Sequence, residues 1–413
     1  MFLPRIPRRR TPVQRARAIV HRLTSGGATL VLLLLAACGD SSGPGGGGGG
    51  ATLSGTVRTA EGSAALEGAT VNAGTRQATS DASGHFELTD LPVGAATVRA
   101  VRPGYLPAEE SVTISPGANT HDFALAVKEA YVSGDYAMYV PAGVQPLRGV
   151  IISLGGGVTT SGFATGDNLG QELENNPELE RSLQALGASL RALAKSSQVA
   201  LLGTTKHGLA NSPASDDALF AAIGEFAGLS GHPEIAAAPV LTFGLDAGSP
   251  QAIGLASRYP ARAIGVLVRV PTSVPDLTAP AALTVPTFVM QSGLDNLVDN
   301  SAIQSRFSAN RSRGGLWALA VEPGIQHAVA TGRGNAANVE WIRTALTLRL
   351  PATPGDPLVA LDEQSGWLGN QATLEIAPWA DYPGTRTGAS WLLSEPVAMS
   401  WQRLGTSTGG GGD

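Results

Sequence analysis

Val-Leu-Thr-Phe-Gly-Leu-Asp-Ala-Gly-Ser-Pro-Gln-Ala, residues 240–252, is the stretch that decides the fold. It begins with an apolar run typical of a buried strand, and after residues 244–248 (Gly-Leu-Asp-Ala-Gly) the pattern becomes helical. This layout predicts a strand, a sharp elbow and a helix, with the middle residue of the elbow held at the top of a sheet, where its side chain can attack a substrate. Serine usually occupies that position, but here the residue is Asp246. Fold and function must therefore be argued separately.

The sequence on both sides of the elbow alternates between apolar runs and helical patterns. We expect strands at the apolar runs and helices where apolar residues recur at helical spacing. The expected strands are 136–140, 150–154, 199–203, 240–244, 264–270, 287–291 and 316–321, and the expected helices are 179–193, 216–229, 250–258 and 336–348. Strands that are apolar almost throughout, with helices between them, indicate a mostly parallel sheet covered on both faces. Residues 128–350 are therefore predicted to form a doubly wound α/β domain.

The N-terminus has the pattern of an export signal. A long basic region extends to Arg22, and the apolar run at 28–37 is shorter than the roughly 20 residues that span a bilayer. The run ends in Leu-Ala-Ala-Cys-Gly, which resembles the lipobox of bacterial lipoproteins, where the cysteine is lipidated after cleavage. We predict a lipoprotein signal peptide at 1–37, lipidation of Cys38, and a flexible glycine-rich tether at 38–50. The alternative is an ordinary secretory signal that leaves a free thiol.

Charge is distributed unevenly along the chain. Seven of the 28 basic residues lie in the first 37 positions, which hold no acid, so the remainder has 21 basic against 33 acidic residues, a balance of −12. This excess of acid argues against nucleic acid as a partner, because phosphate binding needs clustered Lys and Arg. We expect a protein anchored in the bacterial cell envelope, in the periplasm or at the cell surface. Its expected partner is a small-molecule or glycan-linked substrate, with no cofactor, since no His, Asp and Glu spacing resembles a metal site.

Residues 51–127 consist of short alternating runs separated by turn residues, which is typical of a small β-sandwich. Strands are expected at 53–57, 69–72, 85–88, 96–101 and 111–114. The segment resembles the carboxypeptidase regulatory-like domain, a transthyretin-like sandwich. The matching motifs are Gly-Thr-Val at 55–57, Leu-Glu-Gly-Ala-Thr-Val at 66–71, Thr-Ser-Asp at 79–81, Gly-His-Phe-Glu-Leu at 84–88, Leu-Pro-Val-Gly at 91–94 and Gly-Tyr at 104–105. The resemblance implies a spacer or adhesive module, and related sandwiches bind carbohydrate. No exposed aromatic pair stands out as a sugar platform, which favours the spacer role.

Three candidate catalytic residues occur in the order nucleophile, acid, histidine that characterises the α/β-hydrolase fold. Asp246 is on the elbow, Asp295 lies in a strand and acid loop at 286–298, and His327 ends a histidine loop at 322–327. The region resembles bacterial α/β-hydrolase esterases. The resemblance implies that these residues occupy the nucleophile, acid and base positions.

An oxyanion hole also has candidates. Residues 150–157 (Val-Ile-Ile-Ser-Leu-Gly-Gly-Gly) resemble the strand and His-Gly-Gly-Gly motif of esterases, with Leu154 in place of the histidine. The resemblance implies that the N–H groups at Gly155 and Gly156, together with that of Ala247, stabilise a developing oxyanion. The alternative is a plain glycine turn after a strand.

Aspartate on the elbow leaves the chemistry open. A carboxylate needs no activation but is a weak nucleophile toward an ester carbonyl, and it suits attack on saturated carbon, as in the fold's haloalkane dehalogenases and epoxide hydrolases. Dehalogenases usually have tryptophan after the nucleophile, whereas this chain has Ala247. The first hypothesis is a hydrolase of carboxylic esters or related small substrates acting through Asp246. The alternatives are an inactive surface lipoprotein that binds a ligand such as carbohydrate, with His327 in a structural ion pair, and an enzyme that uses Ser249 or another nearby serine as its nucleophile.

Residues 351–413 form a C-terminal extension with four of the six tryptophans, Trp367, Trp379, Trp391 and Trp401. Tryptophans spread over such a stretch favour packing against the flank of the α/β domain. A flap over the active site is the alternative.

Overall fold

The computed structural model describes residues 50–155, 160–166, 177–206, 209–327 and 331–406. The predicted signal peptide, Cys38, nearly all of the tether and Gly156 lie outside the described residues. Within the described ranges, no helix combines the length and apolar character needed to cross a membrane.

The N-terminal part of the described chain is a β-sandwich of two four-stranded sheets. One sheet contains β1 (Ala51–Thr59), β4 (His85–Leu91), β7 (Ala118–Thr120) and β8 (Phe123–Leu125). The other has the order β3 (Arg76–Thr79), β2 (Thr70–Ala73), β5 (Gly94–Val101), β6 (Ala108–Ile114). Side chains alternate between core and solvent, and Leu53, Phe86 and Phe123 are buried between the sheets. The sequence missed β3, β7 and β8 because they are short and β3 buries none of its residues.

The α/β domain is built on one eight-stranded sheet with the order β16-β15-β14-β13-β11-β12-β10-β9. Its strands are β9 (Ala130–Ser133), β10 (Tyr136–Tyr139), β11 (Gly149–Leu154), β12 (Val199–Thr204), β13 (Val240–Leu245), β14 (Ala263–Arg269), β15 (Thr287–Ser292) and β16 (Trp317–Glu322). Strands β11 to β16 are parallel, and β10 and β9 add antiparallel strands at one edge. The mostly parallel sheet predicted from the sequence is confirmed, with β9 as an additional edge strand.

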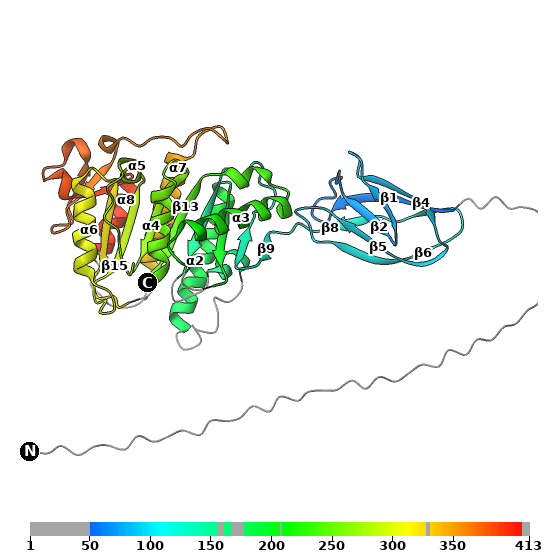
Figure 1. Ribbon diagram of the computed structural model, residues 1–413, viewed down its shortest axis with the longest axis horizontal. Coiled ribbons are helices and arrows are strands. Elements are labelled where there is room, and N and C mark those ends of the chain that lie inside the picture. The colour runs from blue at the N-terminus through cyan, green and yellow to red at the C-terminus, as the bar shows by residue number, and fades with distance from the viewer. Residues whose placement is uncertain (1–49, 156–159, 167–176, 207–208, 328–330, 407–413) are drawn as a thin grey trace, which may run out of the picture. The chain divides into compact units, whose positions relative to one another are not determined.

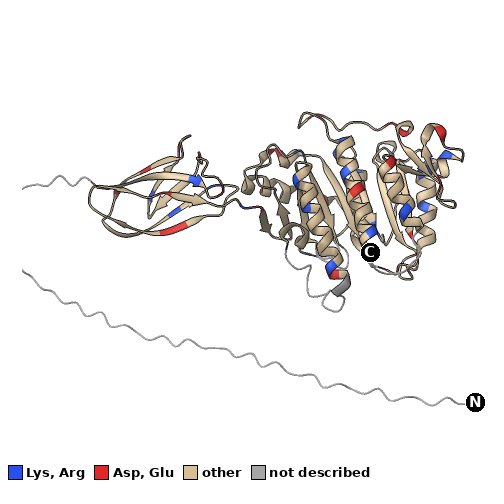
Figure 2. Ribbon diagram, turned by 180° about the vertical axis from the view of Figure 1, so that it is seen from behind, with Lys and Arg blue, Asp and Glu red and all other residues tan. Residues whose placement is uncertain are grey.

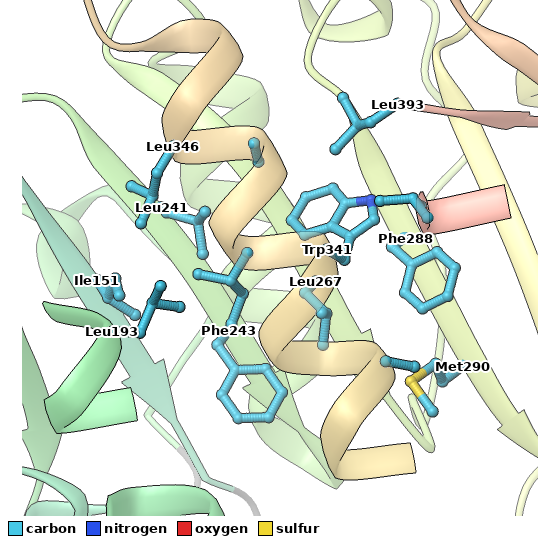
Figure 3. Packing of buried hydrophobic residues seen from close by; sticks show 14 of the residues in the cluster. Ile151, Leu193, Leu241, Phe243, Leu267, Phe288, Met290, Trp341, Leu346 and Leu393 are labelled. Atoms are coloured by element: carbon cyan, nitrogen blue, oxygen red, sulfur yellow. The ribbon is translucent and has the colours of Figure 1, made fainter. Parts of the chain in front are cut away.

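Helices cover both faces of this sheet (Figure 1). They are α1 (Ser161–Thr165), α2 (Pro177–Ser196), α3 (Pro213–Ser230), α4 (Ser249–Arg258), α5 (Pro280–Leu283), α6 (Asn300–Ser312) and α7 (Gly332–Arg349). Alternate residues of one strand enter different cores: Phe243 packs with α2 and α7, whereas Val240 packs with α3 and α4. Figure 3 shows Phe243 in the first of these cores, with Trp341 of α7 beside Phe288. The sequence missed α6, a mostly polar helix that buries Ile303 and Phe307.

The strands of the large sheet carry few charges (Figure 2). Burial on both faces explains this, because an unpaired charge is costly in such a place. The exceptions are Arg269 and Glu322, the last residues of β14 and β16, which are 4% and 3% exposed. Both lie at the carboxyl edge of the sheet, where the predicted catalytic residues also lie.

The C-terminal extension packs on the α/β domain. It forms a small sheet of β17 (Trp367–Gly369), β18 (Ile376–Pro378) and β19 (Ser390–Leu392), followed by α8 (Glu395–Gly405). Trp391 and Trp401 are buried in the same core as α7, and the indole Nε1 of Trp401 donates to the carbonyl of Leu319 on β16 at 2.6 Å. The prediction that the tryptophans pack against the domain is confirmed for these two.

Truncation of Trp401 tests whether the extension is part of the folded core. We expect Trp401→Ala to lower the free energy of unfolding by about 3–5 kcal/mol, because it removes a large buried side chain and leaves a cavity. Met399, on the same helix, is 46% exposed, and Met399→Ala should cost less than about 1 kcal/mol. Urea denaturation of both variants measures the difference. Equal losses would show that α8 is not held by its buried face.

Candidate active site

The elbow after β13 forces Asp246 into a left-handed backbone. Its φ is +49°, in a region that non-glycine residues rarely adopt and that aspartate tolerates better than most. The chain turns tightly because glycine stands on both sides. A Cβ at Gly244 would lie 2.6 Å from the Cα of Ser249, and one at Gly248 would lie 2.2 Å from the carbonyl oxygen of Leu154. The predicted strand, elbow and helix are thus present, with Asp246 at the strained position.

The structure brings the three predicted catalytic residues together. His327 Nδ1 lies 2.7 Å from Oδ2 of Asp295, and His327 Nε2 lies 3.5 Å from Oδ1 of Asp246. The first contact is a hydrogen bond, whereas the second is an ion-pair distance that leaves Nε2 free to engage a substrate or water. The side chain of Asp295 is fully buried, and those of His327 and Asp246 are 17% and 27% exposed. The buried carboxylate therefore orients an imidazole that remains accessible.

Backbone groups hold Asp295 in place. Its Oδ1 accepts hydrogen bonds from the N–H groups of Leu297, at 2.9 Å, and Val298, at 3.3 Å. The acid loop and the histidine loop are also joined directly, since Leu294 N–H donates to the carbonyl of Ile325 at 2.8 Å. The geometry between Asp295 and His327 is thus fixed by hydrogen bonds in both loops.

A partly buried polar network lies where β16 ends and α7 begins. Thr331 donates through Oγ1 to Oε1 of Glu322 at 2.6 Å, and the same hydroxyl accepts from Gly334 N–H at 2.9 Å, capping α7. Arg269 donates to Oδ1 of Asn335 at 3.2 Å. Burial lowers the pKa of Arg269, and the nearby Glu322 carboxylate opposes that shift. This network was not predicted from the sequence, although Arg269 and Glu322 are the only charged residues in the described strands of the large sheet.

The described oxyanion candidates lie at the elbow. Gly155 follows β11 directly and is buried, and a Cβ at Gly248 would lie 3.0 Å from its carbonyl carbon. Ala247 follows Asp246 and is exposed. Gly155 therefore lies against Gly248 of the elbow, one residue after Ala247, while Gly156 is not among the described residues.

Ser249 is poorly placed to act as the nucleophile. It is 0% exposed, and its hydroxyl is buried without a hydrogen-bond partner. A nucleophile must reach the substrate, so the geometry favours Asp246 over Ser249. Among the described residues, no group of His, Cys, Asp and Glu is arranged to hold a metal ion.

Comparison with known proteins agrees with the sandwich. Residues 52–126 match the family model of the carboxypeptidase regulatory-like domain, and this part of the chain is such a domain. No curated protein sequence matches the chain. Similar solved structures include a cohesin and X-dockerin complex from Acetivibrio cellulolyticus, which is 24% identical with a TM-score of 0.18. That match covers 19% of this chain and 60% of the other.

Solved structures similar to the α/β domain include esterases and a depolymerase. Esterase PE8 is 14% identical, and the match covers 52% of this chain and 99% of the PE8 chain with a TM-score of 0.35. A poly(3-hydroxybutyrate) depolymerase from Bordetella parapertussis is 18% identical, with coverage of 53% and 85% and a TM-score of 0.32. The assignment of an α/β-hydrolase fold rests on the strand order, the elbow and the order of the three site residues in this chain.

Two substitutions at the elbow test the backbone strain. Both Asp246→Gly and Asp246→Ala remove the carboxylate, so the difference between their free energies of unfolding measures the cost of the left-handed backbone at this position. We expect the glycine variant to be more stable than the alanine variant by about 1–2 kcal/mol, because only glycine adopts the left-handed conformation without cost. Guanidinium denaturation measures this difference. Glycine less stable than alanine, the usual order in a helix, would contradict the left-handed elbow.

Proposed function

We propose that this protein is an exported hydrolase of carboxylic esters or related small substrates, with Asp246 as the nucleophile. His327 acts as the acid and base, and Asp295 orients it. The observation that carries the proposal is the pairing of a strained, partly exposed carboxylate with an imidazole 3.5 Å away that a buried carboxylate holds in place. A carboxylate in this position needs no proton removed before it attacks.

The reaction with an ester takes two steps. Asp246 attacks the acyl carbon, the N–H groups at Gly155 and Ala247 stabilise the oxyanion, and the alkoxide leaves with a proton from protonated His327. This step forms a mixed anhydride between the acyl group and Asp246. His327, now neutral, takes a proton from water, whose oxygen attacks the acyl carbon and releases the acid. The carboxylate and the protonated imidazole are restored, and one ester and one water have become one acid and one alcohol.

The carboxylate nucleophile restricts the leaving group. In the tetrahedral adduct the Asp246 carboxylate leaves more easily than an alkoxide, so an ordinary alkyl ester reverts to starting material. This reversal does not limit esters of acidic alcohols, whose alkoxides leave easily, or substrates that are attacked at a saturated carbon. Ala247, after the nucleophile, offers no ring N–H to a departing halide. Activated esters therefore fit the site better than haloalkanes do.

A second candidate is an inactive lipoprotein that binds a ligand such as carbohydrate. The observation in its favour is the ion-pair distance between Asp246 and His327, since a protonated imidazole between two carboxylates is a stable structural arrangement. In that case the elbow would be retained as part of the scaffold.

Turnover of a series of phenyl acetates with increasingly acidic phenols separates the two candidates. We expect the native protein to hydrolyse p-nitrophenyl acetate, with kcat/KM rising steeply along the series. Asp246→Asn should lower kcat/KM by about 10³-fold or more, as is typical when one member of such a catalytic unit is lost, and His327→Gln should lower kcat by a similar factor because water is then no longer activated. A native protein inert on these esters, on haloalkanes and on epoxides, together with esterase activity in Asp246→Ser, would instead support the second candidate.

We also propose that Cys38 anchors the mature protein to a membrane of the bacterial cell envelope. The short apolar run and the small residues before the chain's only cysteine support this proposal. Cys38→Ala should move the protein from the membrane fraction to the soluble fraction of expressing cells, because it removes the lipidated thiol. An unchanged distribution in immunoblots of the two fractions would rule out the anchor.

A further inference from the structure

The loop that carries Asp295 exposes two large apolar side chains. Leu294 is 58% exposed and Leu297 is 73% exposed, the highest value among the large hydrophobic residues that the structure describes. Isolated exposed leucines are ordinary on protein surfaces. These two, however, lie within two positions of a buried carboxylate that contacts His327.

Hydrogen bonds keep this loop from turning its leucines inward. Leu294 N–H donates to Ile325, and Leu297 N–H donates to the Asp295 carboxylate. Asp299, at the end of the loop, accepts from Ala302 N–H at 3.0 Å and caps α6. The bonds that hold Asp295 in place therefore also hold the leucines at the surface.

The charge of the surrounding loops disfavours an anionic substrate. The loops at 246–249, 293–299 and 323–327 contain no Lys or Arg, and their charged groups are the carboxylates of aspartates and the imidazole of His327. Arg269 lies near the same edge of the sheet but is buried and donates to Asn335. An anion at these three loops would meet three aspartate carboxylates, and the one positive charge that the loops can offer, that of the His327 imidazole, already faces two of them.

We propose that Leu294 and Leu297 form an apolar lip that binds the alkyl or acyl chain of a neutral substrate whose reactive carbon reaches Asp246. This inference rests on the proposed function of the same site and specifies its substrate class as neutral and apolar. The chain covers the two leucines and thereby removes apolar surface from water on both partners. Each methylene fully removed from water strengthens binding about fourfold.

Binding of uncleaved ligands tests the lip without requiring turnover. The probes are N-butylacetamide and N-octylacetamide, measured by isothermal titration calorimetry on the native chain. We expect the octyl compound to bind at least about tenfold more tightly, because four more methylenes are partly covered. Leu297→Ser should weaken octyl binding about fivefold and butyl binding less than twofold, and Leu297→Met should restore the native value. The matched control is Leu348→Ser, at the far end of α7 and 37% exposed, which should change neither affinity.

Three results would overturn the lip. The first is equal affinity for the two amides, and the second is a loss of octylacetamide affinity in Leu348→Ser as large as that in Leu297→Ser. The third is an effect of Leu297→Ser on sedimentation with phosphatidylcholine vesicles but not on amide binding. The last result would assign the leucines to a membrane surface. Binding that depends on chain length, in a protein that hydrolyses none of these substrates, would contradict the role of Asp246 as nucleophile and support the apolar lip. Hydrolysis of esters with a KM that does not depend on chain length would support the nucleophile and contradict the lip.

Discussion

The left-handed backbone of Asp246 is the constraint on which the site depends. It exists because β13, buried on both faces, must turn into α4 within three residues, and because Gly244 and Gly248 allow contacts that a Cβ would block. Such strain persists only where the surrounding packing fixes it, and it is commonly found at functional sites. The turn presents the carboxylate to His327 and brings Gly155 beside the elbow. One local geometry thereby positions the proposed nucleophile and an oxyanion candidate together.

The carboxyl edge of the sheet supports an oriented imidazole. Asp295 is fixed by two backbone N–H groups, and the histidine loop is closed by Glu322 and Thr331. Burying Glu322 and Arg269 carries a desolvation cost that apolar residues would avoid. A structure that keeps such groups at this edge favours a role for His327 that depends on its exact orientation. Asp246, at the position that serine usually occupies in this fold, is the one departure within this supporting structure.

Much of the fold, and the meeting of Asp246, Asp295 and His327 at one edge of the sheet, could be predicted from the sequence for a physical reason. Parallel strands buried on both faces are continuous apolar runs, and the ends of β13, β15 and β16 carry the elbow, the acid loop and the histidine loop. Elements without that pattern were missed, including the polar α6 and the edge strand β9. The Arg269 and Glu322 network was missed because it joins strand ends far apart in the sequence. The 3.5 Å separation of Asp246 and His327 likewise depends on packing between distant segments.

The central claim is that Asp246 forms a covalent bond with the substrate. In His327→Gln the nucleophile is intact and p-nitrophenolate can leave without a proton, but water is not activated, so the intermediate should accumulate. Intact-protein mass spectrometry after incubation with p-nitrophenyl acetate should show one added acetyl group, and peptide mapping should place it at Asp246. The double variant with Asp246→Asn should show none. An adduct on Ser249, or no adduct from a substrate that the native protein hydrolyses, would contradict this account.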